Sequence, residues 1–171
     1  MIPFLNRISV FVDGNNLFHL QKSSLRWQID VKKILQWVSE RGQVVDATYY
    51  TGIDAENQGL AGYLDVVSRL GYTIESKPVK TITQENGDTM SKANMDVEMA
   101  VDMISTLDRY DTALLVSGDG DFLSVLQALK HRGKGFILLS TYGMVAREIR
   151  QFAGMHYVDF QDIRSNVEKT I

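Results

Sequence analysis

Carboxylates and small polar residues follow two apolar runs of the chain, and their placement indicates metal chemistry. Residues 8–12 (Ile-Ser-Val-Phe-Val) lead into the sequence Asp-Gly-Asn-Asn at 13–16. Residues 112–116 (Thr-Ala-Leu-Leu-Val) lead into Ser-Gly-Asp-Gly-Asp at 117–121. Carboxylates at the C-terminal ends of buried parallel strands lie in the crevice where open α/β sheets bind ligands. Three acids meeting there repel one another unless a cation lies among them. The pattern therefore predicts a divalent-metal site, and metal at such a site suggests phosphate chemistry.

The elements that must position these acids alternate between strand-like and helix-like segments. We expect strands at 8–12, 44–50, 73–79, 112–116, 135–139 and 157–160. We expect helices from about 16, at 30–39, 55–70, 94–107, 122–130 and 145–152, and at the C-terminus. The polar segment 81–91 is interpreted as an exposed loop or small hairpin. This alternation predicts βαβ units in one α/β domain over residues 1–171, with a parallel sheet covered on both faces.

The expected helix 94–107 contributes a further acid. At about 100° per residue, Asp96 lies at the edge of the apolar stripe, whereas Glu98 and Asp102 fall on the opposite, solvated side. The stripe consists of Val97, Ala100, Ile104 and Leu107. In the first turn of this helix, Asp96 either complements the helix dipole or reaches a site above the sheet. The acids expected at the strand ends, Asp13, Asp119 and Asp121, favour the second role. Asp121 has two compatible roles, as a ligand and as the N-cap of the helix after it.

The donor set indicates which cation is expected. Carboxylate oxygens without neighbouring His or Cys favour the hard cations Mg²⁺ or Mn²⁺. The chain has no Cys, and its three His residues are scattered, which argues against zinc. Apolar residues rather than oxygen ligands follow Asp121, which argues against an EF-hand calcium loop.

Composition narrows the protein class further. The 171 residues are 44% hydrophobic, with two prolines and a net charge of −3. This charge argues against a sequence-blind nucleic-acid coat, which is usually basic, but not against a nuclease with an acidic centre. The N-terminus lacks a signal sequence, and no stretch approaches the length of a membrane span. We therefore expect a protein of the cytoplasm with no membrane partner.

Three segments, in order, resemble the hallmark segments of NYN domains. They are Phe-Val-Asp-Gly-Asn-Asn at 11–16, Lys-Ala-Asn-Met-Asp at 92–96 and Leu-Val-Ser-Gly-Asp-Gly-Asp-Phe at 115–122. More narrowly, they resemble the LabA-like group of the PIN-like nuclease superfamily, from about residue 7 to 160. The resemblance implies a three-layer α/β/α fold with strand order 3-2-1-4-5. It also implies metal-dependent RNA cleavage for many members.

The resemblance carries over to individual residues of this chain. The metal-binding and catalytic acids would be Asp13, Asp96, Asp119 and Asp121. Asn16 and Ser117 would orient water, metal or phosphate, and Lys92 would contact a phosphate. Independently of the resemblance, we expect RNA, or alternatively DNA, to approach across a rim formed by Lys92, the segment with Lys77 and Lys80, and the loop 81–91, because cations there would offset the repulsion from the acids. We also allow for a homodimer.

Two other functions stay open at this stage. The first is a regulatory or nucleic-acid-binding NYN domain without significant turnover, because the fold does not fix the function. The second is a haloacid-dehalogenase-like phosphatase, which also begins with a strand-terminal Asp. Such phosphatases need a second acid two residues after the first, and Asn15 stands at that position. An amide cannot supply a proton in that role, which makes this the weaker alternative.

Overall fold

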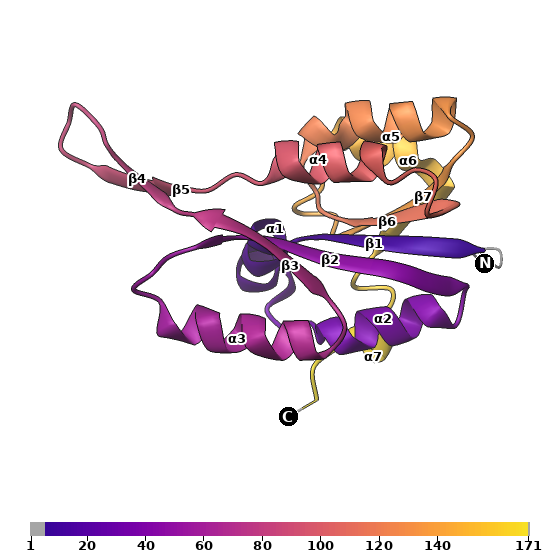
Figure 1. Cartoon of the computed structure of the whole chain (residues 1–171), viewed down its shortest axis with the longest axis horizontal. Helices are drawn as coiled ribbons and strands as arrows, with labels where there is room; N and C mark the ends of the chain where they lie inside the picture. The colour runs from indigo at the N-terminus through magenta and orange to yellow at the C-terminus, as the bar shows by residue number, and fades with distance from the viewer. Residues whose placement is uncertain (1–5, 171) are drawn as a thin grey trace.

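A six-stranded parallel sheet forms the centre of the computed structural model, which describes residues 6–170 except for the side chains of residues 89–92. Its strands lie in the order β3-β2-β1-β6-β7-β8 (Figure 1). Their bounds are β1 Arg7–Asp13, β2 Gln43–Ile53, β3 Thr73–Pro78, β6 Thr112–Val116, β7 Gly135–Ser140 and β8 Tyr157–Asp159. When only the strands of this sheet are numbered along the chain, β6 and β7 become the fourth and fifth, and the order begins 3-2-1-4-5. β8 is a sixth strand at the edge. The predicted α/β fold class and its PIN-like strand order are confirmed.

Helices cover both faces of the sheet, as a three-layer fold requires. Helices α4, α5 and α6 lie on one face, and α2, α3 and α7 lie on the other (Figure 1). Helix α1 packs on the second face through Leu17 and Leu20. The helices are α1 Gly14–Leu20, α2 Val31–Ser39, α3 Gln58–Arg69, α4 Asp96–Ser105, α5 Leu123–His131, α6 Arg147–Ala153 and α7 Arg164–Val167. A π-helical turn, Gln21–Leu25, follows α1, and 3₁₀ turns span Gly120–Phe122 and Gly154–His156. Within the described residues, no helix is long and apolar enough to cross a membrane.

The central strands β1 and β6 are mostly apolar because each contributes to two cores. In β1, Val10 and Val12 pack in the core beneath α1, α2 and α3, and Phe11 packs in the core beneath α4 and α5. In β6, Leu114 packs in the first of these cores and Leu115 packs in the second. Successive side chains of a strand point to opposite faces. A strand covered on both sides therefore needs an apolar residue at nearly every position, which is the pattern in the sequence.

The predicted inner face of α4 is wrong at Val97, whereas Ala100, Ile104 and Leu107 pack against the core as predicted. Val97 is 72% exposed, and the face that packs on the sheet also carries Met95, Met99 and Met103. The helix begins at Asp96 rather than at residue 94, and three methionines four residues apart form one stripe. The predicted solvent position of Asp102 is also wrong. Its side chain is half-buried and accepts a hydrogen bond of 2.8 Å from the hydroxyl of Tyr50.

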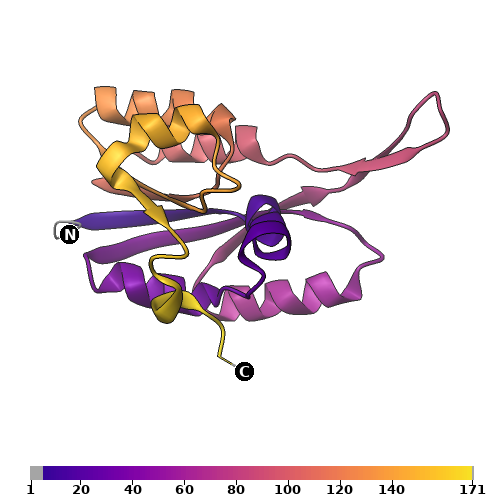
Figure 2. The ribbon, with the colours of Figure 1, turned by 180° about the vertical axis from the view of Figure 1, so that it is seen from behind.

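The segment interpreted as a loop or small hairpin is an antiparallel hairpin of β4 (Lys80–Thr83) and β5 (Thr89–Lys92). It projects beyond the sheet in both views (Figures 1 and 2). Because β3 ends at Pro78 and α4 begins at Asp96, the base of the hairpin lies at the edge of the sheet where the acids are.

Candidate metal centre

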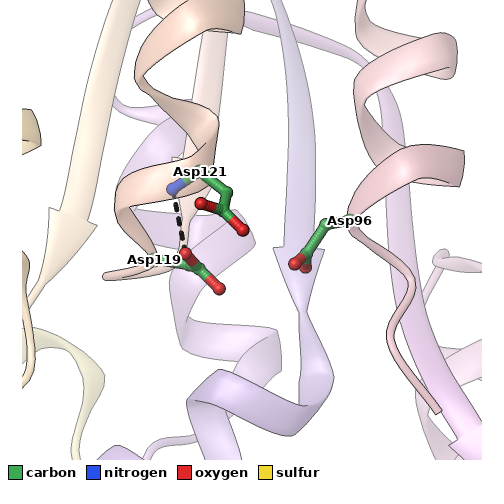
Figure 3. Close-up of side chains that lie close together, drawn as sticks. All are labelled: Asp96, Asp119 and Asp121. Carbon is green, nitrogen blue, oxygen red and sulfur yellow. Dashed lines mark hydrogen bonds between the residues drawn. The ribbon is translucent and has the colours of Figure 1, made fainter.

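Asp96, Asp119 and Asp121 each bring a carboxylate oxygen to within 4.8 Å of the other two (Figure 3). Asp96 comes from the first turn of α4, whereas Asp119 and Asp121 come from the segment between β6 and α5. The three side chains point into a common space between these elements (Figure 3). Asp96 and Asp119 are half-buried, and Asp121 is exposed. The structure thus brings three of the four predicted acids together.

Asp13 lies beside this group, and both of its carboxylate oxygens already accept hydrogen bonds. Oδ1 accepts from the backbone N–H of Asn16 at 3.0 Å, which caps α1, and Oδ2 accepts from the hydroxyl of Ser117 at 3.0 Å. Burial raises the pKa of Asp13 to about 6, against the effect of these hydrogen bonds, and the charges of Asp96 and Asp119 raise it further. Asp13 is therefore an anchor of the site and a fourth negative charge next to the cluster.

A short network ties the segment after β6 to the start of α1. The backbone N–H of Asp119 donates to the hydroxyl of Ser117 at 3.2 Å, and that of Gly118 donates to Oδ1 of Asn16 at 3.0 Å. A Cβ at Gly118 would overlap the carbonyl oxygen of Met144, so this close approach requires glycine. The hydrogen bonds that Asn16 and Ser117 make order the backbone of the site, and Ser117 is fully buried.

Asp119 also shapes the turn that presents Asp121. Its Oδ1 accepts a hydrogen bond of 2.9 Å from the backbone N–H of Asp121, drawn as the dashed line in Figure 3. The idea that Asp121 caps the next helix is wrong, because α5 begins at Leu123 and no side chain caps it. The second oxygen of Asp119 and the exposed carboxylate of Asp121 therefore face the common space.

Asp96 is held at the start of α4 by its neighbour Asn94, whose Oδ1 accepts from the backbone N–H of Asp96 at 2.8 Å. Partial burial raises the pKa of Asp96, and the charges of Asp119 and Asp121 add to this rise, while Asn94 opposes it. Clustered acids of this kind favour a proton or a cation among them.

Three of the four predicted acids line a pocket of about 450 Å³ at the C-terminal edge of the sheet, and Asp121 is not among its lining residues. Its lining includes Asp13, Asp96, Asp119 and Asn16, together with Asp54 and Asn94, which the sequence analysis did not select. Asp54 directly follows β2, so the strand-end argument applies to it, but we expected that strand to end at residue 50. Asn94 stands two residues before Asp96, a spacing typical of a side chain that orders the following turn.

The lysines of the expected rim differ in their surroundings. Lys80 is exposed at the base of the hairpin, where it pairs in register with Lys92. The side chain of Lys92 lies outside the described residues. Lys77, one strand earlier, forms an ion pair of 2.8 Å with Glu98 of α4. Lys77 thus fixes β3 to α4, and Lys80, with its exposed side chain, directly follows the pocket residue Val79.

The carboxylate cluster fits a small divalent cation. Ligands on opposite sides of Mg²⁺ lie about 4.2 Å apart, since each metal–oxygen distance is about 2.1 Å. Neighbouring ligands lie about 3.0 Å apart, so the three oxygens, now within 4.8 Å of one another, would move closer by side-chain rotation to bind one ion. Oxygen donors alone, with charge to be neutralised, suit Mg²⁺ or Mn²⁺. Asp96, Asp119 and Asp121 would hold the ion, with Asp13 at its side.

Asn15 bears on the phosphatase alternative. Its side-chain amide donates a hydrogen bond of 2.7 Å to the carbonyl oxygen of Ala93, which joins α1 to the segment before α4. The position that would carry the general acid of such a phosphatase therefore carries a neutral group with a structural role.

Comparisons with known proteins identify the family of this chain. The family model described as the NYN domain matches residues 7–161. The low amplitude and bright protein LabA of Synechococcus elongatus is 38% identical over 169 residues, covering 96% of this chain and 89% of that protein. An uncharacterized protein of Methanocaldococcus jannaschii is 27% identical over 96% of this chain and 61% of its own length.

A solved structure supports the fold independently. The crystal structure of a protein of unknown function from Vibrio parahaemolyticus matches with a TM-score of 0.79, 20% identity and 99% coverage of both chains. This match concerns the fold alone. The family of the chain follows from the domain match and from the identity to LabA, and both are compatible with the acidic cluster of a metal-dependent nuclease. The chain belongs to the NYN-domain family, within its LabA-like group.

Proposed function

We propose that this protein is a metal-dependent nuclease that hydrolyses phosphodiester bonds, with RNA as its substrate. The observation that carries the proposal is the convergence of Asp96, Asp119 and Asp121 within 4.8 Å at the edge of the sheet. A cluster of acids without a cation destabilises the fold, so its presence in an open pocket is best explained by metal binding. RNA is preferred to DNA because of the resemblance to NYN domains, many of which cleave RNA.

The residues of the pocket would divide the work. When bound, a divalent cation polarises a phosphoryl oxygen and lowers the pKa of a coordinated water. The three clustered acids would hold that cation, and Asp13 would keep Ser117 and the start of α1 in place around it. Asn16 uses its Oδ1 for Gly118, which leaves its side-chain N–H groups to donate to a substrate phosphate.

Substrate would approach along the base of the β4–β5 hairpin. A polyanion is repelled by an acidic site, so nearby cations must offset that repulsion. Lys80 is exposed at this base, and Lys92 stands opposite it in the hairpin register. We propose both as phosphate contacts. Lys77 contributes less because Glu98 neutralises it.

The decisive experiment incubates the purified protein with single- and double-stranded RNA and DNA, in Mg²⁺, in Mn²⁺ and with a chelator. We expect cleavage of RNA that the chelator stops. Asp119→Asn should lose cleavage by about a hundredfold or more, because it removes a charge that holds the cation. The fold should be kept, since Asn caps a turn as well as Asp does.

Asp65→Asn is the matched control. Asp65 is exposed on α3, where it pairs with Arg69, and it lies outside the pocket. The Asp65→Asn variant should cleave RNA at the rate of the parent. Cleavage by Asp119→Asn at the parental rate would contradict the mechanism. Absence of cleavage in the parent, with intact RNA binding, would favour a binding or regulatory domain.

A further inference from the structure

A second cavity, of about 690 Å³, lies next to the carboxylate pocket and is larger than it. The helical segment after β1 forms a wall of both cavities. Asn15, Asn16 and His19 line the carboxylate pocket, whereas Phe18 and Lys22 line the second one. Successive residues of a helix are about 100° apart, so these two sets occupy neighbouring faces. Its lining includes Trp27, Ile29 and Tyr49, which belong to the core on the sheet face of α2, α3 and α7. Figure 2 shows these helices below the sheet.

Aromatic side chains from three separate elements line this cavity. Phe18 comes from α1, Tyr49 from β2 and Tyr63 from α3. Phe18 is 58% exposed and Tyr63 is 40% exposed, whereas Tyr49 is buried. The rings of Tyr49 and Tyr63 meet edge to face, with their centroids 6.1 Å apart. Exposed aromatic rings at the mouth of a cavity offer flat apolar surface to a flat ligand.

Three cations complete the lining, and none of the lining residues is acidic. Lys22, Arg26 and Lys169 are exposed, and no ion pair engages them within the described residues. Arg26 has a left-handed backbone with φ of 59°, a conformation in which glycine is normally preferred. An Arg at that position places a long cationic side chain at the cavity instead. The cavity therefore favours an anion and disfavours a metal ion.

The two cavities meet at adjacent residues of α1. His19 lines the carboxylate pocket, Phe18 lines the second cavity, and their rings lie edge to face with centroids 5.5 Å apart. A nucleic-acid strand with a phosphate at the carboxylates would pass His19 and Phe18 to reach the second cavity.

We propose that the second cavity binds a nucleotide. Its base would stack on Phe18 and Tyr63, and its phosphate would contact Lys22, Arg26 and Lys169. Stacking accepts any base because every base has a flat face, so the site would show little sequence preference. The nucleotide is either free or one unit of a strand that also reaches the carboxylates. The second case rests on the proposed nuclease function, whereas the first does not.

The test measures binding with a chelator present, so that cleavage does not contribute. The probes are the four nucleoside monophosphates, by calorimetry, and a fluorescently labelled single-stranded RNA of about ten nucleotides, by anisotropy. Phe18→Ala should weaken binding about tenfold, since it removes one stacking ring. Lys22→Ala should weaken binding and reduce its dependence on salt, since it removes one phosphate contact.

Matched controls are exposed residues outside the cavity. Tyr142 is 69% exposed near α6, and Lys32 is exposed on α2. Tyr142→Ala and Lys32→Ala should bind like the parent. Phe18 is largely exposed, so its removal should leave the fold intact, as circular dichroism will verify. Lys22→Ala provides a second test that removes no packing.

The binding measurements distinguish a site for a free nucleotide from a subsite for one unit of a strand. Binding of monophosphates that also displace the RNA supports a site for a free nucleotide within the RNA path. Binding of RNA alone, weakened by Phe18→Ala, supports a subsite for one unit of a strand. No binding of either probe, or parental affinity in both Phe18→Ala and Lys22→Ala, would overturn the proposal. A protein that binds nucleotides here but cleaves nothing in Mg²⁺ or Mn²⁺ contradicts the nuclease function alone.

Discussion

Replacing Asp13 by Asn is expected to stabilise the metal-free protein near neutral pH. Burial is the main reason that the pKa of Asp13 rises from 3.8 to about 6, so the charged form is unfavourable in the folded state. This difference of about two pKa units corresponds to about 3 kcal/mol of unfolding free energy at high pH. Asn keeps the oxygen that caps α1, but it must donate to Ser117 instead of accepting from it. We therefore expect a gain of about 1–3 kcal/mol.

The gain should depend on pH in one direction. Because the pKa of Asp13 is higher in the folded state, its contribution to stability is complete below pH 3.8 and is lost as the pH rises through about 6. Asn does not titrate. The variant and the parent should therefore differ little near pH 4, and the advantage of the variant should reach its full size above about pH 7.

Urea unfolding in the presence of a chelator measures this difference at each pH. Asp65→Asn, which removes an exposed carboxylate, is the control and should change stability little at any pH. An Asp13→Asn variant that is less stable than the parent at about pH 8, or a difference that does not change with pH, would refute the reasoning. The first result would mean that the hydrogen bond to Ser117 outweighs the buried charge.

Three further predictions follow from the same contacts. Mg²⁺ or Mn²⁺ should raise the melting temperature of the parent, because an ion at a hundred times its Kd adds about 2.7 kcal/mol to the free energy of unfolding. Scanning calorimetry should find no such rise in Asp119→Asn. Lys80→Ala should weaken RNA binding and flatten its salt dependence, and an unchanged salt series would place the substrate path elsewhere. Asp111→Asn should lower the melting temperature at neutral pH, because the Arg7 guanidinium holds the pKa of Asp111 at about 2. That contribution is present above pH 3.8 and is lost as the pH falls through about 2, so melting curves of the variant and the parent should converge in strong acid.

The fold could be predicted because its determinants are local in the sequence. Residues 8–12 of β1 and 112–116 of β6 are apolar at four of five positions each, as parallel strands covered on both faces require, and a glycine stands one or two residues after each strand. The same pattern places Asp13 and Asp119 at one edge of the sheet. The exposure of Val97 on α4 could not be predicted in this way. Val97 is as apolar as Met99, and only contact with the sheet decides which of them is buried.

The sequence predicted those acids of the site that stand at the end of a strand or at the start of a helix. Asp54 was missed because β2 continues three residues beyond the expected end, a length that its neighbouring strand β3 determines. The role of Asp13 was also incomplete. Sequence spacing places it at the strand end, but it does not show that Asn16 and Ser117 occupy both of its oxygens. The second cavity is lined by residues from α1, β2, α3 and the C-terminal segment, and no local sequence pattern relates these segments.

The order of the strands divides the molecule at the projecting hairpin. Everything before the hairpin supplies β3, β2 and β1, and everything after it supplies β6, β7 and β8, so the two halves meet at the β1–β6 pairing. The carboxylates are divided in the same way, with Asp13 in the first half and the clustered three in the second. A chain cut within the exposed turn near Gly87 should therefore stay associated as two fragments. Expressed separately, the halves should form the complete site only on reassociation, which makes this protein a candidate for a split reporter.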